Sequence, residues 1–136
     1  MTRSRYRRSL RAAVGASAAP YGFTLSTWTT GAVLTHTQGI PNTLDALLFL
    51  AGAVLGFAVV GGIAFGGVTK RLEREAEEPR PLWTSLHFPS VALALGAASL
   101  VTWALRGEAA WIVGPFCATV AYLLALAAEG IAAREV

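Results

Sequence analysis

The chain has 136 residues, of which 54% are apolar and only 14% are charged, and its formal net charge is +3. This composition is too apolar for an ordinary soluble domain of this length. The apolar residues gather in four long runs, so we expect an all-α, polytopic membrane protein. The expected architecture is a four-transmembrane-helix bundle that occupies residues 20–136 as one domain.

Residues 1–19 form a basic segment that carries five arginines, namely Arg3, Arg5, Arg7, Arg8 and Arg11. The segment differs from a secretory signal because no leucine-rich apolar core lies between Arg11 and Pro20. We interpret it as a cytoplasmic anchor of membrane topology. Binding to anionic lipid is a second role, since each basic residue near an anionic leaflet contributes about 1 kcal/mol.

The first expected span covers about residues 20–36 and is rich in hydroxyl side chains. At about 100° per residue, one helical face carries Thr24, Thr27, Gly31 and Thr35. Hydroxyls in membrane helices commonly bond to their own backbone or to a neighbouring helix. This packing role stands beside a second interpretation, in which the threonines line a solute path.

The second expected span, about residues 43–69, contains the glycine-rich stretch AGAVLGFAVVGGIAFGG. Each glycine would cost a helix in water about 1 kcal/mol relative to alanine. A bilayer enforces helical hydrogen bonds, because unpaired backbone groups are costly in lipid. Two successive GxxxG pairs, Gly52 with Gly56 and Gly62 with Gly66, therefore predict a face for close helix packing.

Charge placement predicts the orientation of the chain. With four spans, both termini and the loop 70–88 lie on one side, and that side then holds all of the 11 basic residues except Arg106. The positive-inside rule places this side in the cytoplasm, so we expect a multi-pass protein of the cell (inner or plasma) membrane with cytoplasmic N- and C-termini. The preference for arginine over lysine suggests a GC-rich bacterial source.

The third and fourth expected spans cover about residues 89–106 and 109–130. The fourth carries a stripe of small residues that includes Gly114, Ala121 and Ala128. Such stripes allow helices to approach closely. They fit either packing inside one bundle or contacts with other membrane subunits or a second copy of the chain.

Polar residues gather at the two short outer turns. We expect Asp45 and Arg106 to meet there, either as turn and anchor chemistry or as the entrance to a solute path that continues along Thr24, Thr27 and Thr35. No acid or base lies at the centre of a span, which argues against a proton-driven pump.

The sequence carries no motif for catalysis, for a cofactor or for a metal, and its two histidines fall on opposite sides of the expected membrane. We expect neither an enzyme nor a nucleic-acid partner. The favoured function is a small non-catalytic accessory, scaffold or packing subunit of a membrane assembly. The alternative is a homo-oligomeric channel or uncoupled carrier for an ion or small solute, lined by the first helix.

Overall fold

The computed structural model describes residues 21–65 and 88–132, which form four α-helices and, within these ranges, no strand. The first helix covers residues 21–38. It is followed by α2 (Thr43–Phe65), α3 (Phe88–Ala104) and α4 (Glu108–Ala132). The all-α fold is thereby confirmed. The predicted cytoplasmic loop and the predicted N-terminal anchor lie outside the described residues, apart from position 88 of the loop.

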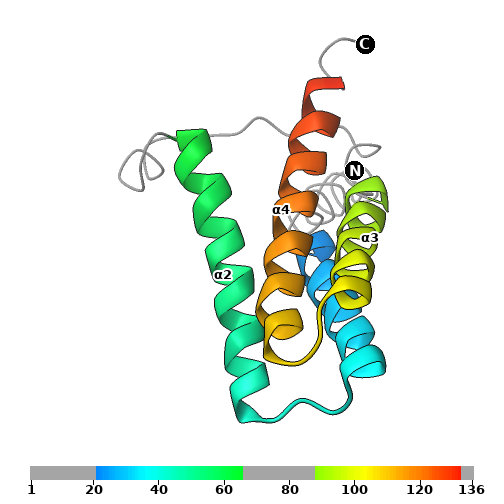
Figure 1. Ribbon diagram of the computed structural model, residues 1–136. Coiled ribbons are helices and arrows are strands. Elements are labelled where there is room, and N and C mark those ends of the chain that lie inside the picture. The colour runs from blue at the N-terminus through cyan, green and yellow to red at the C-terminus, as the bar shows by residue number, and fades with distance from the viewer. Residues whose placement is uncertain (1–20, 66–87, 133–136) are drawn as a thin grey trace, which may run out of the picture.

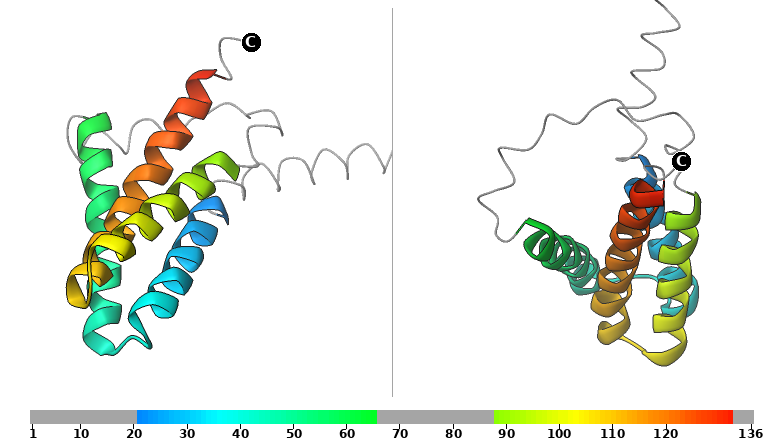
Figure 2. Two further views of the ribbon diagram at one scale, coloured as in Figure 1. Left: turned by 45° about the vertical axis from the view of Figure 1, so that its right-hand side comes forward. Right: turned by 90° about the horizontal axis from the view of Figure 1, so that it is seen from above.

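The four helices run alternately in opposite directions (Figure 1). The turns at 39–42 and 105–107 lie at one end of the bundle, which we call the turn end. Helices α2 and α4 finish at the opposite end, which we call the terminal end. Helix α4 is central, with α2 on one side, α3 on the other and the first helix behind it (Figures 1 and 2).

Two small clusters of buried residues hold the other helices to α4. Near the terminal end, Ala94 and Ala98 of α3 pack against Ala118 and Tyr122 of α4, and the ring of Phe23 meets the Tyr122 ring edge-on at 6.0 Å. Nearer the turn end, the buried residues are Leu34, Ala110 and Trp111. The alanines keep the α3 and α4 backbones close, because small side chains allow two helices to approach each other.

Glycines at positive φ form the two turns. Gly39 (φ 94°) donates its N–H to the carbonyl of Thr35 at 3.1 Å, which caps the first helix. Gly107 (φ 63°) turns the chain from α3 into α4. Other residues rarely adopt this left-handed conformation, because their β-carbon approaches the following carbonyl.

Helices α2 and α4 are long and apolar enough to cross a membrane, whereas α3 is a shorter apolar helix of 17 residues. The most apolar part of α2 is only 17% buried in the bundle. Large apolar side chains of α2 are exposed at Leu47, Leu50, Val54 and Ile63. The core helix of a soluble protein would bury most of this surface.

Candidate functional site

An open groove of about 720 Å³ lies between the first helix and α2. Thr27, Gly31 and Thr35 line its first-helix wall, and Phe49 and Trp111 form its aromatic floor. The two floor rings meet edge-on, with 6.4 Å between their centroids. The volume falls within the range of about 300–1,000 Å³ that small-molecule sites occupy.

The structure brings only part of the expected solute path to this groove. Thr27 and Thr35 line it, but Thr24, Asp45 and Arg106 are not among the lining residues. The expected path is therefore only partly assembled, because Asp45 lies in the first turn of α2 and Arg106 on the turn between α3 and α4, both outside the groove lining.

Hydroxyl groups of the first helix donate hydrogen bonds to their own backbone. The acceptor is the carbonyl four residues earlier, at 2.7–3.0 Å, for Ser26, Thr27, Thr29, Thr30 and Thr37. This is the ordinary behaviour of hydroxyls in apolar helices. The Thr27 hydroxyl that lines the groove therefore already donates its proton to the backbone of its own helix.

Asp45 caps the start of α2. Its carboxylate accepts the backbone N–H of Asn42 at 3.0 Å, and the Asn42 side-chain oxygen accepts the N–H of Asp45 at 2.9 Å. This reciprocal arrangement satisfies two backbone donors at the helix N-terminus. The expected pairing of Asp45 with Arg106 is replaced by this cap, and Arg106 is exposed on the other turn.

Gln38 joins the two turns, a role that the sequence did not reveal. Its side-chain oxygen accepts the Gly107 N–H at 3.0 Å, and its amide nitrogen donates to the Leu105 carbonyl at 3.4 Å. A polar residue at a helix end is unremarkable in sequence, so only the tertiary arrangement identifies this clamp.

Gly52 and Gly56 lie directly on the backbone of α4. A β-carbon at Gly52 would collide with the carbonyl oxygen of Ile112, and one at Gly56 would lie 2.8 Å from the carbonyl oxygen of Phe116. On α4 itself, Gly114 faces Leu34 of the first helix, with a β-carbon there 3.4 Å from the nearest methyl. These three positions are used for packing between helices of the bundle.

The remaining predicted packing residues are not used in this way. A β-carbon at Gly62 would meet nothing within 4 Å, as would one at Gly61. Ala121 is half-buried and Ala128 is exposed on α4. Helices α2 and α4 diverge toward the terminal end (Figure 1). Gly66 lies outside the described residues.

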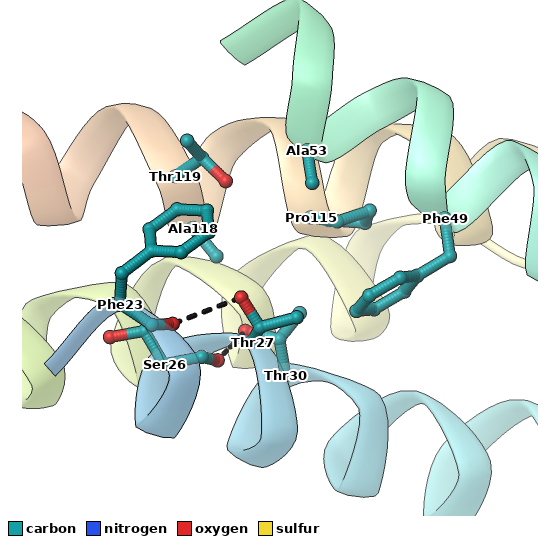
Figure 3. Close-up of a pocket in the computed structure, with 9 residues that line it drawn as sticks. All are labelled: Phe23, Ser26, Thr27, Thr30, Phe49, Ala53, Pro115, Ala118 and Thr119. Atoms are coloured by element: carbon teal, nitrogen blue, oxygen red, sulfur yellow. Dashed lines mark hydrogen bonds between the residues drawn. The ribbon is translucent and has the colours of Figure 1, made fainter. Parts of the chain in front are cut away.

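A second, much smaller cavity lies where the first helix, α2 and α4 meet (Figure 3). It has a volume of about 10 Å³ beside Pro115 and is lined by Ser26, Thr27, Thr30 and Thr119 together with apolar side chains. Proline removes one helical N–H, so α4 lacks one backbone hydrogen bond at this level. The space holds about one water molecule, which makes this junction a packed core.

A polar contact fastens α3 to α4 near the terminal end. The hydroxyl of Ser90, which is fully buried, donates to the Glu129 carboxylate at 2.7 Å. The two residues are 39 positions apart, so no local pattern links them.

No three potential metal-ligating side chains gather within 21–65 and 88–132. No protein-family model, curated protein or solved structure matches the chain. Two features of the described residues bear on function: the groove beside the first helix, and the small residues that the bundle leaves uncovered.

Proposed function

We propose that the chain is a small, non-catalytic integral membrane protein that serves as an accessory or packing subunit of a membrane assembly. The observation that carries this proposal is the division of its small residues. Gly52 and Gly56 are used against α4, whereas Gly61 and Gly62 face open space on the same helix. Within residues 21–65 and 88–132, the bundle thus leaves a close-packing surface unused.

Membrane residence is supported by the exposure of α2. A helix with so many uncovered leucine, valine and isoleucine side chains would expose an aggregating surface in water. In a bilayer the same apolar surface would contact lipid acyl chains. The proposed orientation places both termini in the cytoplasm, with the arginines of residues 1–19 against anionic head groups, because Arg106 is the one basic residue at the turn end.

A partner transmembrane helix is the occupant that best fits the uncovered small residues. Between helices in lipid there is little hydrophobic driving force, so association depends on van der Waals contact between closely approaching backbones. Gly62 together with Ala58, one helical turn earlier, offers such an approach on α2. A side chain larger than alanine at Gly62 would hold a partner helix away.

Native mass spectrometry of protein gently extracted from its own membrane tests this proposal. We expect the wild-type chain to appear among other subunits and Gly62→Leu to appear alone. Gly96→Leu is the matched control, because Gly96 also faces open space but lies on α3. An intact assembly in Gly62→Leu, or a wild-type chain that has no protein partner, would contradict the proposal.

A homo-oligomeric channel or uncoupled carrier is the second candidate. It is favoured by one observation, that Thr27, Gly31 and Thr35 line the large groove. In a ring of copies, this wall would border a shared path. The candidate predicts solute flux in liposomes that Thr27→Leu reduces, and absence of flux across a broad panel of ions and small solutes would count against it.

A further inference from the structure

We propose that the groove between the first helix and α2 retains one hydrocarbon chain of a bilayer lipid, with the lipid head group at the His36 end. The lipid comes from the leaflet on the side of the turn end. This inference rests on the proposed membrane residence, and it is independent of whether a protein partner binds at Gly62.

The length of the groove matches one leaflet. Its first-helix wall extends from Thr27 to His36, and nine helical steps at 1.5 Å per residue give about 14 Å. The hydrocarbon core of a bilayer is about 30 Å thick, so one leaflet contributes about half of that. A chain that enters beside His36 and Pro41 would reach the middle of the membrane at Thr27.

The chemistry of the groove is that of an amphiphile site. Its lining is mainly apolar and aromatic, with Trp28 on the first-helix wall away from the turn end and Phe49 and Trp111 on the floor. Its polar groups other than Thr27 lie at the turn end, at Thr35 and His36. The Thr27 hydroxyl already donates to the Phe23 carbonyl, so a hydrocarbon chain beside it leaves no donor unpaired.

Missing side chains create the room for this chain. Gly31 contributes no side chain to the wall, and a β-carbon there would be 3.9 Å from the Phe49 ring, which is ordinary contact. Ala32 and Ala46 are exposed on facing helices and also line the groove. Trp111 is only 4% exposed and lines this groove, so a hydrocarbon chain in the groove would lie against its ring.

Fluorescence quenching by lipids with brominated acyl chains tests the inference. Two single-tryptophan proteins are reconstituted in phosphatidylcholine vesicles, one that keeps Trp111 and one that keeps Trp103, with the other tryptophans changed to phenylalanine. Trp103 is 82% exposed on α3 and reports ordinary contact with the bilayer. The groove is filled by Ala32→Leu with Ala46→Leu, and Ala51→Leu is the control at an exposed α2 position outside the groove.

We expect brominated lipid to quench Trp111 in the unfilled protein, and the filled variant to lose at least half of that quenching. Trp103 should be quenched equally in all variants. Quenching of Trp111 in Ala51→Leu should equal that in the protein that keeps Ala32 and Ala46. Unquenched Trp111, or equal quenching of Trp111 with the groove filled, would overturn the lipid site while quenched Trp103 still supports membrane residence. Unquenched Trp103 would overturn both.

Discussion

Gly52 of α2 lies on the backbone carbonyl of Ile112 in α4, with no room between them for a β-carbon. One helical turn later, Gly56 stands in the same relation to Phe116. The contact is made by backbone on backbone, so neither partner can move aside as a flexible side chain would. It fixes how closely α2 approaches the central helix, and it ends before Gly61 and Gly62.

The close approach predicts opposite effects of the same substitution on one helix. Gly52→Ala should lower the free energy of unfolding by about 1–3 kcal/mol, because overpacking forces the helices apart. Gly62→Ala has open space around it and should be neutral or stabilising, since alanine is favoured over glycine in a helix by about 1 kcal/mol. Reversible unfolding in mixed micelles measures both, and a Gly52→Ala protein as stable as Gly62→Ala would contradict the contact.

The reciprocal bonds at the start of α2 predict that Asn42 and Asp45 act together. Asn42→Ala should cost about 1 kcal/mol of stability, the usual effect of losing a helix cap. Asp45→Ala should cost a similar amount, and the double variant should cost less than the two single effects added, because both remove one shared arrangement. Strict additivity in the same unfolding assay would show that the two residues act separately.

The contact between α3 and α4 predicts a similar dependence on Ser90. Ser90→Ala removes a donor to Glu129 and should lower stability by about 1–3 kcal/mol, the usual cost of losing a buried hydrogen bond to a charged group. Ser99→Ala is the control, because the Ser99 hydroxyl is exposed and bonds only to the carbonyl of Leu95 in its own helix. Equal effects of the two substitutions would argue against a specific role for the Ser90–Glu129 bond.

The proposed orientation predicts which end of the bundle outside reagents reach. In a Cys117→Ala background, Ile40→Cys should react with a membrane-impermeant maleimide in intact cells, because Ile40 is 93% exposed at the turn end. Phe88→Cys, exposed at the beginning of α3, should react only after permeabilisation. Labelling of Phe88→Cys in intact cells would reverse the orientation, and equal labelling of both would argue against insertion.

The helices could be predicted because apolar run length is a local property, and glycine spacing predicted that Gly52 and Gly56 share one face of α2 without predicting what that face contacts. The cap at Asn42 also has a sequence signal, since an N-cap residue followed three positions later by an acid is a known helix start. The divergence of α2 from α4 could not be predicted, because periodicity gives the face of a helix and not its tilt. For the same reason, one continuous face from Gly52 to Gly62 was expected where the structure divides it.

The aromatic floor of the groove lay beyond sequence reasoning as well. Phe49 and Trp111 are 62 positions apart in numbering, and their contact depends on how α2 and α4 cross. Two residues of the predicted threonine face, Thr27 and Thr35, line the groove, but the residues that they face could not be predicted from spacing. Helical spacing identifies which residues share a surface, and tertiary packing decides what that surface faces.

Photocrosslinking in native membranes tests most directly whether the uncovered part of α2 contacts another protein. A photoreactive amino acid is placed at Ala58, one turn before Gly62, and in a matched protein at Leu93, which is exposed on α3. The account predicts a discrete protein adduct from Ala58 and only lipid adducts from Leu93. Lipid adducts alone from Ala58, or a protein adduct from Leu93 only, would contradict it.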